Sequence, residues 1–176
     1  MTLLQETTDK LTDAFTEVEK VGNSFSEVQF FQRPPGGKWS AAEHVQHLFV
    51  SAKPLVGLFG KPELMLQFGK CERPGMHYDQ VVTQYREKLS SPSAIPVVSR
   101  NNVEGLSPTQ EEQLANLQAI QSKFVERAAT LTDEILDRYQ APHPLMGMLT
   151  AREWLYFTHY HTGHHMNSMM EMLTIS

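Results

Sequence analysis

Three short polar sequences mark where helices begin in this chain. Residues 40–43, 107–110 and 150–153 each place a serine or threonine three positions before a glutamate or glutamine. In such a capping box the hydroxyl and the longer side chain satisfy free N–H groups of the first helical turn. Long runs that alternate between apolar and polar residues, which are typical of half-buried strands, are missing from the sequence. It therefore predicts an all-α fold.

The spacing of apolar residues and prolines sets the expected lengths of the helices. Leucine, phenylalanine and valine recur at helical spacing from Leu3 to Val18. Pro54 is expected to end the second helix, because proline lacks an N–H and clashes with the preceding turn. A shorter helix is expected near residues 77–89, and a loop or short extended piece at 94–98. The main helices are expected over about residues 3–21, 40–52, 108–130 and 150–173.

Between the second and third helices the sequence predicts a long, irregular connection over about residues 53–106. Five prolines interrupt it: Pro54, Pro62, Pro74, Pro92 and Pro96. No internal repeat or low-complexity tract divides the rest of the chain. A chain of 176 residues has the size of one domain, so a single helical bundle over residues 1–176 is expected.

Composition excludes several classes of function. Hydrophobic residues make up 40% and charged residues 20% of the chain, as in an ordinary globular protein. The net charge of −5 argues against a nucleic-acid partner, because phosphate binding needs a basic surface. No apolar run approaches the roughly 20 residues that span a bilayer, and the polar N-terminus does not resemble a signal peptide. With Cys71 as its one cysteine, the chain is expected in the cytoplasm, away from membranes.

Histidines are concentrated near the C-terminus, in "THYHTGHHMNSM". His161 and His165 are four residues apart, so they project from one face of a helix, as two imidazoles that share a metal would. Gly163 between them could allow close helix packing or access of a ligand. A third ligand would come from the second helix, where periodicity does not choose between His44 and His47. Exposed or hydrogen-bonded histidines without any metal remain the simpler alternative.

A family resemblance chooses between these alternatives. The stretches "GKWSAAEHVQHL", "HPLMGMLTAREWLYF" and "YHTGHHMNS" together resemble the DinB-like (YfiT-related) superfamily. The resemblance implies a four-helix up-and-down bundle with a longer irregular insertion between helices two and three. It also implies a homodimer and the metal ligands His47, His161 and His165. Ser168 departs from the pattern, since many relatives have glutamine three residues after the last ligand.

Three histidine nitrogens leave a divalent metal its full charge and at least one open coordination position. Zinc or nickel is expected, with iron or cobalt also compatible. The resemblance implies a thiol-dependent S-transferase that joins a low-molecular-weight thiol to a small electrophilic molecule. One alternative is a hydrolase that uses a metal-bound water, with Glu43 as general base, although the capping box explains Glu43 equally well. The other alternative is a non-enzymatic stress protein that binds a metal or a small molecule.

Three further residues carry weaker expectations. His44 could support a ligand, but a surface position is favoured. His143 could reach the mouth of a pocket, although loop histidines usually need no special explanation. Trp39 precedes the first capping box and is expected to pack as the hydrophobic staple that sets the angle at which the chain enters the helix.

Overall fold

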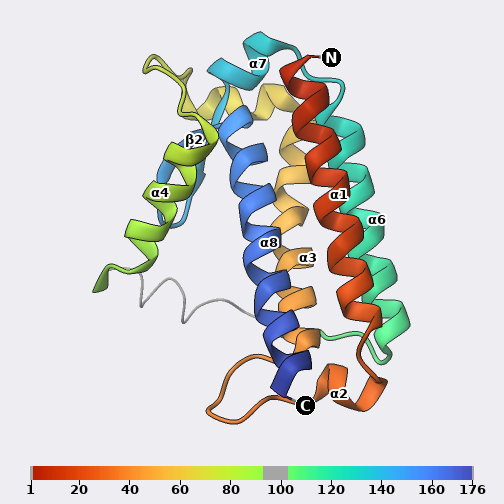
Figure 1. The fold of residues 1–176 in the computed structure, drawn as a ribbon. Coiled ribbons are helices and arrows are strands. Elements are labelled where there is room, and N and C mark those ends of the chain that lie inside the picture. The colour runs from red at the N-terminus through yellow and green to blue at the C-terminus, as the bar shows by residue number, and fades with distance from the viewer. Residues whose placement is uncertain (1, 93–102, 176) are drawn as a thin grey trace.

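Four long helices lie side by side in the computed structural model, which describes residues 2–92 and 103–175 (Figure 1). Helix α3 packs mainly against α6, and α1 packs mainly against α8. The expected all-α bundle is confirmed. The long helices are α1 Leu3–Asn23, α3 Ala41–Gly60, α6 Gln110–Ala128 and α8 Ala151–Ile175.

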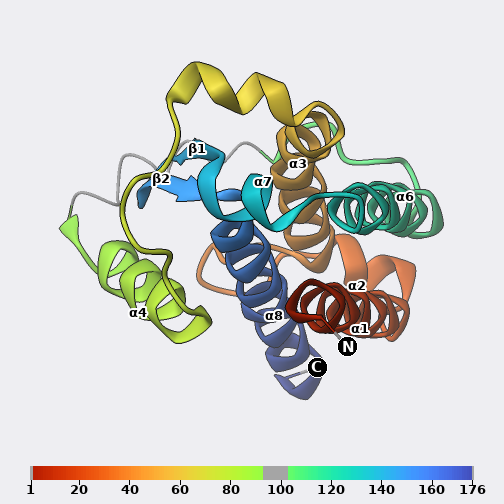
Figure 2. The same cartoon turned by 90° about the horizontal axis from the view of Figure 1, so that it is seen from above.

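The insertion between α3 and α6 sets the direction in which α6 runs relative to α3. It contains the 3-10 helix η1 (Pro62–Phe68) and α4 (Tyr78–Leu89), which lies outside the four-helix layer against α8 (Figure 2). The helix expected near residues 77–89 is thus confirmed, while residues 94–98 lie outside the described part of the chain. Because the insertion carries the chain back along the bundle, α6 runs parallel to α3 (Figure 1). The direction therefore does not alternate at this step, as a strict up-and-down order would require. Phe59 and Phe124, near the ends of these two helices, accordingly pack with ring centroids 4.9 Å apart.

Two of the three predicted capping boxes are present. The Glu43 N–H donates to the Ser40 hydroxyl (3.2 Å), and the Ser40 N–H donates to the Glu43 carboxylate (2.8 Å). Thr150 and Glu153 make the equivalent pair at 3.2 and 2.9 Å. The third prediction was wrong by two residues: α6 is capped by Thr109, whose hydroxyl accepts from the N–H of Glu112.

Pro54 does not end the second helix, and that prediction was wrong. Helix α3 continues through Pro54 to Gly60. Pro54 and Val50, one turn earlier, lie on the exposed side of the helix, where water can hydrate the carbonyl that proline leaves unpaired. Beyond the proline, Leu55 and Phe59 are buried in the core, and each buried side chain of this size contributes about 1.5–3 kcal/mol.

Short elements complete the fold. They are α2 (Glu27–Phe31), α7 (Asp133–Arg138) and the antiparallel hairpin of β1 (Gln140–His143) and β2 (Gly147–Thr150). The sequence did not predict α2 or the hairpin. The hairpin directly precedes α8, and the Ala151 N–H donates to the Tyr139 carbonyl at 2.8 Å. It therefore fixes the start of the helix that carries the histidine cluster.

The buried apolar side chains form two clusters, one toward each end of the bundle. The larger contains Leu11, Phe59, Phe124 and Leu155, and the smaller contains residues such as Phe30 and Met169. Within the described residues, no helix is both long enough and apolar enough to cross a membrane.

Candidate metal centre

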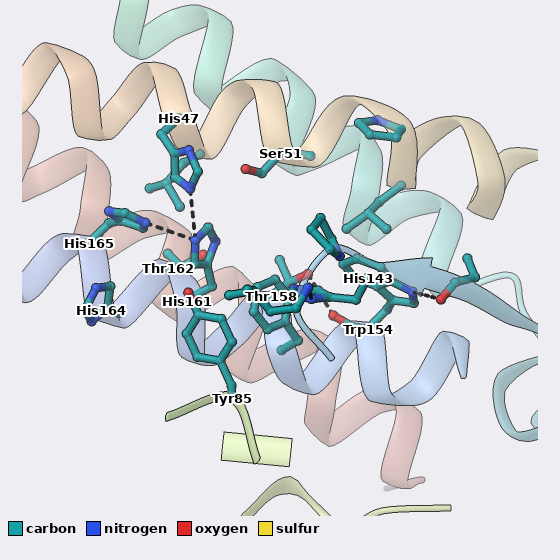
Figure 3. Close-up of a pocket in the computed structure, with 18 of the residues that line it drawn as sticks. His47, Ser51, Tyr85, His143, Trp154, Thr158, His161, Thr162, His164 and His165 are labelled. Carbon is teal, nitrogen blue, oxygen red and sulfur yellow. Dashed lines mark hydrogen bonds between the residues drawn. The ribbon is translucent and has the colours of Figure 1, made fainter. Parts of the chain in front are cut away.

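Three histidines from two helices meet inside the bundle. Helix α3 supplies His47, and α8 supplies His161 and His165 one turn apart (Figure 3). The Nε2 atom of His161 lies 3.1 Å from Nε2 of His47 and 3.0 Å from Nε2 of His165. The structure therefore brings together the three residues that were expected to be metal ligands, with their nitrogens facing one another.

This arrangement fits a divalent metal ion. Two imidazole nitrogens that share a metal at 2.0–2.1 Å lie about 3.0–3.4 Å apart, depending on the coordination angle. The observed separations of 3.0 and 3.1 Å are within this range. Three ligands leave a coordination position open, as in catalytic rather than structural zinc sites. The ligand atoms of all three residues lie within 4.8 Å of one another, so the three side chains could hold a metal.

The environment keeps these imidazoles neutral. Burial, together with a smaller effect of the neighbouring His164, lowers the pKa of His47 to about 4. Burial, and then the surrounding histidines, also hold the pKa values of His161 and His165 well below their usual range. A neutral imidazole has one nitrogen with a free electron pair, which is the form that binds a metal.

His44 supports the centre, although a surface position was favoured for it. Its Nδ1 atom lies 2.8 Å from Nδ1 of His165. If His165 donates its Nδ1–H to His44, the Nε2 atom of His165 is left with a free electron pair for a metal. Ligating histidines commonly donate their second ring N–H in this way, which fixes their orientation. Helix α3 thus uses both of its histidines, one at the centre and one behind it.

Trp39 covers the same group of histidines. Its ring is nearly parallel to that of His165, with an angle of 12° and centroids 6.0 Å apart. It also lies 5.1 Å from the His47 ring and 5.5 Å from the His44 ring. The contact with His44 joins the residue before the cap to the fourth residue of the helix, so the expected staple is confirmed.

Glu43, the expected general base of a hydrolase, is occupied by other contacts. Its carboxylate accepts the Ser40 N–H and forms an ion pair with Arg33, whose Nε lies at 2.8 and 3.0 Å from the two oxygens. Burial would raise the pKa of Glu43, but the hydrogen bonds from Arg33 and Ser40 and the charge of Arg33 outweigh it, so the pKa is lowered. A carboxylate with a lowered pKa is a weaker base. The catalytic role of Glu43 stays a prediction.

A cavity of about 670 Å³ opens beside the centre. His47, His161 and His165 lie at one end of it (Figure 3). Most of the remaining lining is apolar and includes Leu55, Trp154 and Phe157. No aspartate, glutamate, lysine or arginine is among the described residues that line it. Burial raises the pKa of the lining Tyr85 to about 12, so its hydroxyl stays protonated. The cavity suits a neutral, largely apolar molecule.

Two small residues near the centre, Gly163 and Ser168, were singled out in the sequence. A methyl group added at Gly163 would meet nothing within 4 Å, so close helix packing does not explain this glycine. Ser168, in the position where many relatives have glutamine, donates its hydroxyl to the His164 carbonyl of its own helix at 3.2 Å. It is not among the residues that line the cavity.

A helical bundle with three converging histidines beside an apolar cavity defines a class of candidate metal-binding proteins. Residues 4–169 match the family model of the DinB superfamily, and the chain belongs to that superfamily.

Similarity to a solved structure agrees with this assignment. The fold is similar to that of YfiT from Bacillus subtilis, which is described as a probable metal-dependent hydrolase with an unusual four-helix bundle topology. The TM-score is 0.63 at 18% identity, over 98% of this chain and 87% of YfiT. At this identity the similarity shows the fold alone. No curated protein matches the sequence.

Proposed function

We propose that this chain is a metal-dependent enzyme that transfers a low-molecular-weight thiol to a small, neutral electrophile. The observation that carries the proposal is the convergence of three neutral imidazoles at one end of a cavity whose described lining residues include no carboxylate. His47, His161 and His165 would hold the metal, and His44 would orient His165. A zinc or nickel ion held there would supply a Lewis acid that keeps a bound nucleophile ionised near neutral pH.

The lining of the cavity favours a thiol over water as the nucleophile. A thiol has a pKa of about 8.5 and needs little help to ionise, whereas water, with a pKa of about 15.7, depends on a metal to bring its pKa near 7. In the transfer, a bond from sulfur to carbon forms while the bond from carbon to the leaving group breaks. The leaving group takes the electron pair of that bond, and the thiol proton passes to solvent. This chemistry requires no carboxylate base, and none of the described lining residues supplies one.

A metal-dependent hydrolase is the second candidate, because YfiT is described as a probable one. The same three histidines would be its ligands. Its base would be Glu43, whose pairing with Arg33 and Ser40 makes it less suitable. A bundle that binds a metal or a small molecule without turnover is the third reading.

Elemental analysis of protein purified without a histidine tag tests the centre. The comparison is with the triple variant His47→Ala, His161→Ala, His165→Ala, and with His159→Ala as the matched control. About one metal per chain, kept in the control and lost in a folded triple variant, would support the proposal. Absence of metal after incubation with zinc, nickel, iron and cobalt would refute both enzymatic readings.

Activity assays then separate the candidate reactions. Consumption of glutathione or cysteine with chlorodinitrobenzene, dependent on the metal, is expected of the transferase. Metal-dependent release of nitrophenol from nitrophenyl acetate without any thiol would instead indicate the hydrolase. Metal binding with neither reaction would favour the non-enzymatic reading.

A cytoplasmic homodimer without a nucleic-acid partner completes the proposal. Sedimentation that shows only monomer would contradict the dimer. A salt-sensitive mobility shift with short duplex DNA would contradict the absence of a nucleic-acid partner.

A further inference from the structure

His143 lines the cavity but is not one of the three histidines of the centre. It is the last residue of β1 and is only 8% exposed. Its ring lies 4.4 Å from that of Phe157 and 5.0 Å from that of Trp154. These neighbours hold the imidazole in place as part of the wall of the cavity (Figure 3).

The hairpin fixes which nitrogen of His143 carries the proton. Its Nδ1 atom accepts hydrogen bonds from the backbone N–H groups of Leu145 (3.0 Å) and Met146 (3.2 Å). A nitrogen that accepts cannot carry a hydrogen, so the neutral ring must carry its proton on Nε2. Burial lowers the pKa of His143 to about 4, which keeps the ring neutral at ordinary pH.

The Nε2–H group is directed away from the hairpin turn and has no partner among the described residues. Among the described residues, the only side-chain nitrogen or oxygen that is both fully buried and without a partner belongs to Arg152. Nε2 of His143 is therefore not fully buried, and because His143 lines the cavity, this nitrogen is open to it. A donor in a largely apolar cavity loses about 1–3 kcal/mol if nothing accepts from it. A ligand with a suitably placed acceptor would recover this loss.

We propose that His143 is a specificity-determining residue whose Nε2–H donates to a neutral acceptor oxygen, such as a carbonyl or nitro oxygen, on the bound molecule. A neutral acceptor is indicated because neither lysine nor arginine is among the described lining residues, so none is available beside His143 to pair with an anion. Phe157 separates the two polar ends, with its ring 4.4 Å from His143 and 4.9 Å from His161. The molecule would therefore place an apolar body along Phe157 and its acceptor at the end away from the centre. The inference rests on the proposed function only in taking this cavity as the substrate pocket.

Acetophenone and α-methylstyrene form a matched pair of probes, because they differ mainly by oxygen in place of a methylene group. Their dissociation constants would be measured by NMR titration of metal-free and zinc-loaded protein. In His143→Asn, the Asn oxygen can replace Nδ1 as acceptor for the turn, while nothing replaces Nε2–H. The preference for acetophenone is expected to fall about 2- to 10-fold in this variant, the range of one neutral hydrogen bond. His159→Asn, which changes a histidine on α8 that bonds Tyr78 outside this cavity, should keep the preference.

A second measurement does not depend on the stability of a variant. Nitrogen-15 NMR of the wild-type protein should show His143 as the Nε2–H tautomer. An Nδ1–H tautomer, an unchanged preference in folded His143→Asn, or no binding of acetophenone in the cavity would each overturn the assignment. Because the titration is also made without metal, failure of zinc binding would refute the proposed function without deciding this result.

Discussion

Replacing His44 with phenylalanine should weaken metal binding without abolishing it. The change removes the 2.8 Å contact between Nδ1 atoms that orients His165, while an aromatic ring remains to pack against Trp39. Loss of the group that orients a ligating histidine typically lowers metal affinity 10- to 100-fold, or about 1.4–2.7 kcal/mol. Since His47, His161 and His165 remain, the stoichiometry should stay at one metal per chain.

Competition with a coloured zinc chelator would measure this loss. Wild type, His44→Phe and the control His159→Phe would be compared at one pH and ionic strength. The control should match wild type, because His159 bonds Tyr78 on the far side of α8. An affinity of His44→Phe within twofold of wild type would refute the orienting role. Complete loss of binding would also refute it, because His44 would then be a ligand.

Three further predictions concern stability. Gly163→Ala should raise the stability by about 0.5–1 kcal/mol, since the methyl group meets open space in mid-helix; a lower melting temperature would contradict this. Glu153→Gln should cost about 2–4 kcal/mol at neutral pH, because the buried carboxylate pairs with Arg73 and accepts from the Met76 N–H. Burial alone would raise the pKa of Glu153, but these partners outweigh it and lower the pKa. The contribution to stability is therefore present above about pH 4.5 and is lost as pH falls. Urea unfolding should show the wild type and the variant converging in acid. In the wild type, the low pKa of His143 should reduce stability by about 1.4 kcal/mol per pH unit as pH falls from 6.5 to about 4, because the unfolded chain binds the proton first. His143→Asn lacks this group, so its stability should fall less steeply over this range. An equally steep acid dependence in the variant would refute this.

Much of the fold could be predicted because helix starts and helical periodicity are local properties. The Ser40–Glu43 and Thr150–Glu153 boxes are complete within four residues, and the structure contains both. Pro54 was misleading for the opposite reason. Its effect depends on which side of α3 meets solvent and on the burial of Phe59 beyond it, and neither is visible in the local sequence.

The site could be predicted only in part. Spacing on one helix pairs His161 with His165, but the choice of His47 came from a family resemblance. The role of His44 depends on a contact between residues 121 positions apart, which one sequence cannot reveal. The hairpin that holds His143 has only four residues in each strand, too few for alternation to be distinguished from chance.

The separation of 114 positions from His47 to His161 has a consequence for assembly of the protein. On the proposed function, a bound metal joins α3 to α8 and closes a loop of this length. Because the unfolded chain does not hold these ligands together, a metal would stabilise the folded chain by mass action, by about 2.7 kcal/mol at a free metal concentration 100 times its dissociation constant. Both ligand-bearing helices must already be adjacent before the three nitrogens can converge. The metal would therefore bind late in folding and stabilise a bundle that its apolar clusters have already assembled.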